Sequence, residues 1–428
     1  MFMAVNTVER GNSLSFPKNG EKPKQSTIAV LDGVRAFACF AVICYHVNHL
    51  TVNHLWSSAH LGSILSNTMQ SGFSGVTLFF ILSGFLLFMT YARSLLFDEA
   101  WPQMKRFYLR RIFRILPGYY VSLVLMVLIF HREYLQFDHL GQLSLFFSFL
   151  MDATAQTYQK LNGPFWTLAI EWQFYMFLPL LALGLRWIVQ RGSLRRRLTT
   201  LLLCLGALIL WGVTIRQWGS NWQQSPHQAA FLPVWLHNML FFIFYGHSGK
   251  YLEDFSIGMI ISVLYALFQY APEHAISRFL PKGSRIFWFA GLLCLFFAVS
   301  WPFSSYTYVA WHLFGPHQGM AEVPYSLGYG LCVLGILFGA RDLQWFWQLR
   351  PLRWLGMLSY GLYMWHLPLI FVFTSYIEPW MRSWNHMLVY SLIWLWVIAI
   401  AIPTSYVFHL LIEQPWIKIG SRLVGKKS

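Results

Sequence analysis

Charged residues are scarce in this sequence. Only 11% of its 428 residues are Asp, Glu, Lys or Arg, whereas a soluble domain carries about 25%. Hydrophobic residues make up 57%, and several apolar runs are long enough to cross a hydrocarbon core about 30 Å thick. The composition excludes a soluble globular enzyme. It predicts an all-α, polytopic transmembrane helical bundle that forms a single domain in the lipid bilayer.

Cysteine motifs and an N-terminal apolar segment are also lacking. The five cysteines all lie in apolar stretches without a CxxC pair, so we expect small buried side chains, and no metal site is predicted. Residues 1–27 are polar and contain no apolar core, which predicts a flexible cytoplasmic tail rather than a signal peptide. The transmembrane domain is expected over 28–416, followed by a basic cytoplasmic tail over 417–428.

Acidic residues are half as numerous as basic ones, 16 against 31, which gives a net charge of +15. Such a charge is found in nucleic-acid-binding proteins, but here the basic residues collect in short loops between apolar runs. Membrane proteins keep Lys and Arg in their cytoplasmic loops. The charges therefore serve as topology signals, and no nucleic-acid partner is predicted.

Ten membrane spans satisfy this charge rule best. With the N-terminus in the cytoplasm, ten spans place 26 of the 31 Lys and Arg residues inside, and both termini are then cytoplasmic. Two further apolar stretches, 141–151 and 231–247, are ambiguous, and adding the first alone as a span removes the bias. The expected spans are 29–49, 72–92, 113–131, 164–186, 198–217, 252–270, 286–303, 325–340, 354–375 and 387–410.

The apolar stretch 31–50 carries Arg35 near one end and His46 near the other. Eleven residues make roughly three helical turns, so the two side chains share one face, about 16 Å apart along the axis. Ionisable groups inside a membrane are rare and mark pathways or reaction chambers. Glu171 is expected at a depth similar to that of His46, where it would orient the imidazole as a general base. A purely structural hydrogen-bonded pair is the alternative.

Arg111 and Arg114 lie three residues apart at the cytoplasmic end of the third expected span. The positive-inside rule alone explains several charges in this region, but Arg114 lies just inside the apolar run. Guanidinium groups on one helix face offer forked donors to phosphate oxygens. The pair therefore indicates a phosphate-bearing cytosolic donor such as coenzyme A or a nucleotide.

Polar residues form a stripe on the ninth expected span. Ser359, Tyr363 and His366 recur at helical spacing on an otherwise apolar helix. Such a stripe either faces a polar cavity or ties neighbouring helices together, and both interpretations stay open. On the fourth span, Tyr175 follows Glu171 by one turn and shares its face.

The order of several motifs resembles the membrane acyltransferase-3 family, which includes bacterial O-acetyltransferases of surface polysaccharides. The first motif contains the Arg–x10–His pattern at Arg35 and His46, and the third contains the Arg-x-x-Arg pattern at Arg111 and Arg114. This sequence departs from the family in having Thr77 and Trp172 where an acidic residue is usual. The matching segments are LDGVRAFACFAVICYH (31–46), GFSGVTLFFILSGFLL (72–87), RRIFRILPGYY (110–120), WTLAIEWQFYMFLP (166–179), LGMLSYGLYMWHLPL (355–369) and IEQP (412–415).

The resemblance implies an integral O-acyltransferase of the bacterial inner membrane. Its donor would be acyl-CoA, most often acetyl-CoA, and its acceptor a hydroxyl of a carbohydrate or lipid-linked glycan at the outer side. By resemblance His46, Glu171 and Arg35 are the catalytic residues, and Arg111 and Arg114 bind the donor. The expected substrate-binding residues are Ser359, Tyr363, His366, Trp166 and Tyr175.

Two points stay open at the level of the sequence. His46 either takes the acceptor's proton or carries the acyl group, and Arg35 either holds the donor or polarises its carbonyl. The competing class is a proton-coupled transporter, in which buried His, Glu and Arg residues form a relay or a substrate site. A transporter predicts interrupted helices at corresponding positions of two halves, and none is evident in the sequence.

Overall fold

The computed structural model describes residues 28–51, 67–190, 192–224, 233–300, 320–381 and 383–425. Within these residues the chain is helical and contains no strand, which confirms the all-α prediction. The expected tail 1–27 and most of the two loops expected between spans, 52–66 and 301–319, lie outside the described residues.

In the described part of the chain, eight helical segments are long and apolar enough to cross a membrane, or up to ten if each of two bent pairs counts as one span. On that count the prediction of about ten spans is confirmed. The helices of the first two-thirds of the chain are α1 (Ala29–Thr51), α3 (Gly75–Phe97), α4 (Met104–Ile129), α5 (Leu140–Phe147), α6 (Phe165–Val189), α7 (Leu194–Gln224), α8 (Val234–Phe244), α9 (Leu252–Tyr270) and α10 (Ala275–Ser300), with short 3-10 turns at η1 (Ser71–Ser74), η2 (Arg132–Leu135) and η3 (Phe137–His139).

The last third of the chain is more broken. It contains α12 (Val323–Phe338), α13 (Arg341–Trp345), η6 (Phe346–Gln348), α14 (Arg350–Met357), α15 (Ser359–Val372), η7 (Phe373–Ile377), η8 (Glu378–Met381), α16 (His386–Trp396), η9 (Val397–Ala401), α17 (Ile402–Phe408), η10 (His409–Glu413) and α18 (Gln414–Gly425). The segments from His386 to Gly425 form one helical stretch, with π-helical turns at η9 and η10. Residues 417–425, expected as a tail, therefore belong to α18.

The expected span over 354–375 is interrupted, because the chain bends by 73° between α14 and α15. α14 is short and amphipathic, and it carries Arg350 and Arg353, which would be costly to bury in hydrocarbon. It packs across the start of α1, where a Cβ on Gly356 would lie only 1.9 Å from the Asp32 carbonyl oxygen. A second bend, of 112°, separates α12 from the α13–η6 segment.

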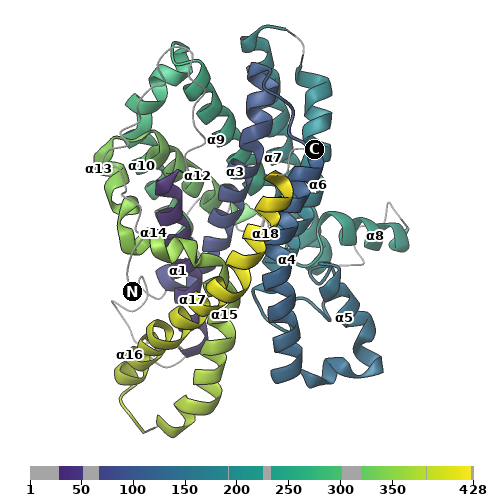
Figure 1. Cartoon of the computed structure of the whole chain (residues 1–428), viewed down its shortest axis with the longest axis vertical. Coiled ribbons are helices and arrows are strands. Elements are labelled where there is room, and N and C mark those ends of the chain that lie inside the picture. The colour runs from purple at the N-terminus through teal and green to yellow at the C-terminus, as the bar shows by residue number, and fades with distance from the viewer. Residues whose placement is uncertain are drawn as a thin grey trace.

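The two ambiguous stretches form short helices, α5 with eight residues and α8 with eleven. At 1.5 Å per residue they are about 12 and 16 Å long, well below the thickness of a hydrocarbon core. Neither can cross the membrane alone. Figure 1 shows both at the edge of the bundle, away from its centre.

Helix α3 runs through the middle of the bundle, between α9 and α12 on one side and α6 and α7 on the other (Figure 1). Its contact with α9 relies on two glycines. A Cβ on Gly84 would lie 2.1 Å from the carbonyl oxygen of Phe255, and one on Gly258 would lie 2.0 Å from that of Ile81. Small residues let two membrane helices approach closely, which strengthens their packing. Residues of α3 also line the site described below.

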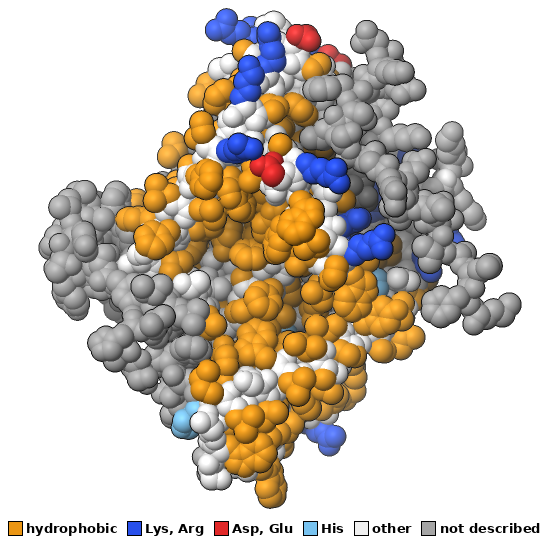
Figure 2. All heavy atoms as spheres, turned by 90° about the vertical axis from the view of Figure 1, so that its left-hand side faces the viewer, with side chains coloured by type: hydrophobic (Ala, Val, Ile, Leu, Met, Phe, Trp, Pro, Cys, Tyr) orange, Lys and Arg blue, Asp and Glu red, His pale blue; other side chains and the backbone are white. Residues whose placement is uncertain are grey.

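The outer surface of the bundle is apolar. Figure 2 shows one face covered by hydrophobic side chains, with Lys and Arg side chains gathered at the top and along one side. Exposed Leu293 and Phe296 on α10, Leu395 on α16 and Ile398 on η9 contribute to the apolar exterior. A surface of this kind suits lipid chains, so the protein is an integral membrane protein.

Closing the space at the α3–α9 contact should destabilise the bundle. In Gly258→Ala the new methyl group must push the helices apart, at an expected cost of about 1–3 kcal/mol. In Gly206→Ala on α7, where nothing lies within 4 Å, alanine's higher helix propensity should leave stability unchanged or slightly raised. Thermal unfolding of the two purified variants in detergent measures the difference. Equal melting temperatures would contradict the packing described here.

Candidate active site

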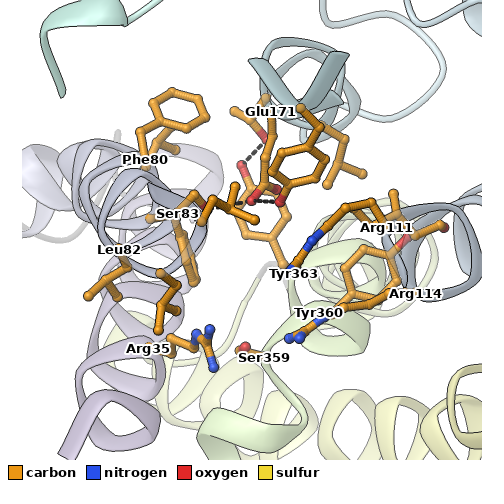
Figure 3. A pocket seen from close by; sticks show the side chains of 18 residues that line it. Arg35, Phe80, Leu82, Ser83, Arg111, Arg114, Glu171, Ser359, Tyr360 and Tyr363 are labelled. Atoms are coloured by element: carbon orange, nitrogen blue, oxygen red, sulfur yellow. Dashed lines mark hydrogen bonds between the residues drawn. The ribbon is translucent and has the colours of Figure 1, made fainter. Parts of the chain in front are cut away.

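A narrow cavity of about 120 Å³ is lined by three arginines. Arg35 reaches it from α1, and Arg111 and Arg114 reach it from α4. Figure 3 shows the guanidinium groups of Arg35 and Arg114 facing each other across this space, with Ser359 between them in the view. We call it the arginine cavity. The three arginines singled out from the sequence therefore line the same cavity.

Glu171 lies in the arginine cavity as well. Ser83 Oγ donates a hydrogen bond of 2.5 Å to Glu171 Oε1, and the Tyr175 hydroxyl donates a second bond to the same oxygen. Two donors to one oxygen are what an ionised carboxylate accepts. The guanidinium of Arg111 lies 5.8 Å from the centre of the Tyr175 ring. Glu171 and Tyr175 are thus part of the arginine-rich site.

The arginine cavity is suited to an anion. Its lining contains three guanidinium groups and one carboxylate. Arg35 lies 3.5 Å from Asp32, whereas Arg111 and Arg114 form no ion pair with any residue that the structure describes. The Nε of Arg111 is buried without a hydrogen-bond acceptor in the described part of the chain. A buried donor without an acceptor is costly, and a phosphate oxygen would provide an acceptor for Arg111 Nε.

A second and larger cavity, of about 790 Å³, contains His46. We call it the histidine cavity. Trp166 forms part of its wall, and its ring centre lies 5.8 Å from that of Tyr158 and 5.8 Å from that of Tyr251. Glu322 contributes a carboxylate to the same lining. A wide space walled by aromatic rings with a few polar groups is typical of a small-molecule or sugar site.

His46 is paired with another histidine. His366 Nε2 lies 3.1 Å from His46 Nδ1, and the two ring centres are 4.9 Å apart. His366 Nδ1 lies 2.9 Å from the Leu362 carbonyl oxygen, so this nitrogen must carry a hydrogen and Nε2 is left as an acceptor. His46 Nδ1 also faces a carbonyl oxygen, that of Val42, at 2.9 Å.

These contacts assign the tautomer of His46. Both neighbours of its Nδ1 are acceptors, so Nδ1 carries the hydrogen and Nε2 carries the free lone pair. No hydrogen bond to Nε2 is formed by any residue in the described ranges, and His46 lines the histidine cavity. A neutral imidazole of this kind can accept a proton from a group bound in that cavity.

One sequence prediction is therefore wrong. Glu171 does not orient His46, because its partners are Ser83 and Tyr175 in the other cavity, and the partner of His46 is His366. His366 is completely buried and lines neither cavity, and its role in substrate binding stays a prediction. The depth of Glu171 was inferred from its distance to the helix end. The depth of Glu171 in the membrane does not determine which neighbouring helix its side chain faces.

The polar stripe on α15 has both of its expected roles. Ser359 and Tyr363 line the arginine cavity, while His366, one turn further, ties α15 to α1 through His46. The structure also gives the positions of the two residues that depart from the family pattern. Thr77 is buried and lines the histidine cavity. Trp172 stacks on Phe149 with the ring centres 5.2 Å apart, and it lines neither cavity.

The two cavities meet at Val76 and Tyr363, which are the described residues that line both. Thr167 lies beside them and forms a hydrogen bond with the Tyr363 hydroxyl at 2.8 Å. The sequence prediction missed Thr167, although it directly follows the predicted Trp166. It also missed Tyr158 and Tyr251, which come from distant segments and carry no local signal.

Comparison with known proteins identifies related sequences. Residues 28–410 match the model of a family described as an acyltransferase domain. The chain is 26% identical over 373 residues to the peptidoglycan O-acetyltransferase OatA of Listeria monocytogenes. It is 26% identical over 364 residues to the putative peptidoglycan O-acetyltransferase YrhL of Bacillus subtilis, and 26% over 368 residues to the O-acetyltransferase OatA of Staphylococcus aureus.

These alignments cover 80–81% of this chain but 49–51% of each relative. The chain therefore spans about half the length of the curated relatives it matches. No solved structure matches the chain. In the described part of the chain, no three His, Cys, Asp or Glu side chains gather to hold a metal ion.

Inorganic phosphate should stabilise the protein through the arginine cavity. At a concentration 100 times its Kd, a ligand that binds only the folded state adds about 2.7 kcal/mol to stability. We expect the melting temperature in detergent to rise with phosphate at constant ionic strength. Arg114→Gln should lose most of this response, whereas Arg285→Gln, at an exposed ion pair with Asp342, should keep it. An equal response in both variants would rule out phosphate binding at this cavity.

Proposed function

Because the chain belongs to the acyltransferase family whose model it matches over residues 28–410, we propose that it is a membrane O-acetyltransferase acting on a glycan of the bacterial cell envelope. The donor is acyl-CoA, most often acetyl-CoA, bound from the cytoplasmic side. The acceptor is a sugar hydroxyl at the outer side. The observation that carries this proposal is the pair of adjoining cavities, one rich in arginine and one containing an oriented histidine.

The donor's phosphates bind at Arg111 and Arg114. Arg is suited to this because its planar group offers paired donors to phosphate oxygens. Arg35 and His46 lie eleven residues apart on α1, about 16 Å along its axis. The extended arm that links the phosphates of coenzyme A to its thioester can span such a distance. The thioester then reaches the shared wall at Tyr363, close to the histidine cavity.

The acceptor binds in the histidine cavity. Apolar faces of sugar rings pack on aromatic side chains, and Trp166, Tyr158 and Tyr251 provide three such rings in one wall. The names of two relatives, in Listeria and Bacillus, specify peptidoglycan as their acceptor. We propose a glycan acceptor for this chain on the combined support of those names and of the aromatic lining.

In the proposed reaction His46 is the general base. Its Nε2 takes the proton of the acceptor hydroxyl while the hydroxyl oxygen forms a bond to the thioester carbonyl carbon. The carbon–sulfur bond breaks, and His46 returns the proton to the leaving thiolate. The products are the O-acyl glycan and free coenzyme A, so no proton is gained or lost. This sequence needs no acyl-histidine intermediate.

His366 acts as a positioning residue in this reaction. Its Nε2 accepts the hydrogen of His46 Nδ1 and so holds the imidazole in the tautomer that leaves Nε2 free. Glu171 takes a different role from the one expected for it. It holds the hydroxyl groups of Ser83 and Tyr175 and offsets part of the arginine charge in the donor site.

A transporter is not favoured by the fold. Transporters of the inverted-repeat type have interrupted helices at corresponding positions of two halves. Here the two bent pairs, within 323–348 and 350–381, follow each other directly in the last third of the chain. They do not form such a pair of corresponding positions.

Removing the general base should abolish transfer. We expect His46→Gln to lower acceptor-dependent release of coenzyme A from acetyl-CoA by about 100-fold or more, since general-base catalysis contributes 10²–10⁴. The measurement uses purified protein in proteoliposomes with a crude cell-envelope glycan extract. His139→Gln, whose ring contacts Gln142 on a short outer turn, is the control and should retain activity. Equal rates in the two variants would argue against His46 as the base.

Replacing His366 tests its positioning role separately. His366→Leu should lower kcat by about tenfold or more and leave the KM for acetyl-CoA unchanged, because the donor site lies in the other cavity. The pH dependence of kcat/KM should shift, since His46 loses an acceptor at Nδ1. His366→Gln, whose amide oxygen can accept the same hydrogen bond, should recover part of the rate. A loss of folded protein with an unchanged pH profile would reduce His366 to a packing residue.

A further inference from the structure

The side chain of Tyr363 separates the two cavities. It lines both of them, and its ring packs edge-on against Phe79 with the ring centres 5.6 Å apart. Its hydroxyl lies 2.8 Å from Thr167 Oγ1, which in turn lies 2.8 Å from the carbonyl oxygen of Pro164. Because the carbonyl can only accept, Thr167 donates to Pro164 and Tyr363 donates to Thr167.

This arrangement closes the passage with a weak bond. A hydrogen bond of this kind contributes only about 0.5–1.5 kcal/mol, so little free energy is needed to release Tyr363 from Thr167. Val76 is the other described residue common to both cavities, and it is apolar and smaller than tyrosine. Tyr363 is therefore the larger of the two shared side chains, and its movement would change the opening between the cavities.

Keeping the cavities apart has a chemical consequence. The oxygen of a water molecule can form a bond to the thioester carbonyl carbon as a sugar hydroxyl does. The carbon–sulfur bond then breaks, and the proton passes through His46 to the thiolate, which yields a free carboxylic acid and coenzyme A. A thioester exposed to the water of the histidine cavity would be lost in this way. Excluding water from a reactive intermediate is a recognised function of closed active sites.

We propose that Tyr363, held by Thr167, is the residue that favours transfer to the acceptor over hydrolysis, by closing the arginine cavity to the histidine cavity until an acceptor is bound. The inference rests on the proposed function, and it adds a specificity-determining residue to that reaction.

The chain offers a matched control three residues earlier. Tyr360 also lines the arginine cavity, and its hydroxyl also donates a hydrogen bond, at 2.9 Å to the Ile115 carbonyl oxygen. It does not line the histidine cavity. Tyr360→Phe and Tyr363→Phe therefore remove the same atom from two tyrosines of one helix, and only the second weakens the closure.

The first test measures hydrolysis of acetyl-CoA without acceptor. Relative to wild type, Tyr363→Phe and Thr167→Val should raise the ratio of acceptor-independent to acceptor-dependent coenzyme A release by about fivefold, which corresponds to one hydrogen bond of about 1 kcal/mol. Tyr360→Phe should leave the ratio unchanged. An unchanged ratio in all three variants, with transfer intact, overturns the role of Tyr363. Absence of acceptor-dependent release in the wild type overturns the proposed function instead.

The second test needs no donor. In a variant without its five native cysteines, Leu86→Cys places one thiol in the lining of the arginine cavity. A membrane-impermeant maleimide added to the outside of right-side-out vesicles should label this thiol slowly. With Tyr363→Ala added, labelling should be at least about tenfold faster, whereas Tyr360→Ala should not change its rate. Fast labelling with Tyr363 in place would show that the passage is open and overturn the proposal.

Discussion

A charged side chain inside a bilayer must be paired or must line a polar space, because hydrocarbon provides neither hydrogen bonds nor solvation. The arrangement of the central helices follows from this constraint. Arg35, Arg111 and Arg114 come from two helices and line a single polar cavity. Glu171 is held there by two hydroxyl donors, Ser83 from α3 and Tyr175 from its own helix. Close packing through the glycines of α3 and α9 then keeps the surrounding bundle tight enough to exclude lipid from this space.

The same constraint explains why the partner of His46 is a neutral imidazole. In many enzymes a carboxylate orients the catalytic histidine. His366 provides an acceptor without adding an ionised group, and its own Nδ1 is satisfied by a main-chain carbonyl oxygen. His46 Nδ1 and both ring nitrogens of His366 therefore have partners. His46 Nε2 forms no hydrogen bond with any residue that the structure describes, and His46 lines the larger cavity.

Much of this site could be predicted from the sequence, because helical spacing fixes which residues share a face. Arg35 with His46 on α1 and Arg111 with Arg114 on α4 were predicted for that reason. Spacing does not determine how two helices are rotated toward each other, and so Glu171 was placed beside the wrong partner. The bend before Ser359 was also missed, since the apolar run continues through it and the packing of Gly356 on Asp32 is a contact between distant segments. Tyr158 and Tyr251 were missed because they too reach the site from segments that are distant in the sequence.

Helix α1 links the two cavities. It carries Arg35 in the arginine cavity and His46 in the histidine cavity, at a separation set by the backbone rather than by flexible loops. Under the proposed function, a donor held by its phosphates at Arg111 and Arg114 needs an arm long enough to bring its reactive carbon to Tyr363, where the two cavities meet. A short phosphate ester would bind at the arginines without reaching that boundary. On this proposal, the distance from the arginines to Tyr363 limits which donors can react.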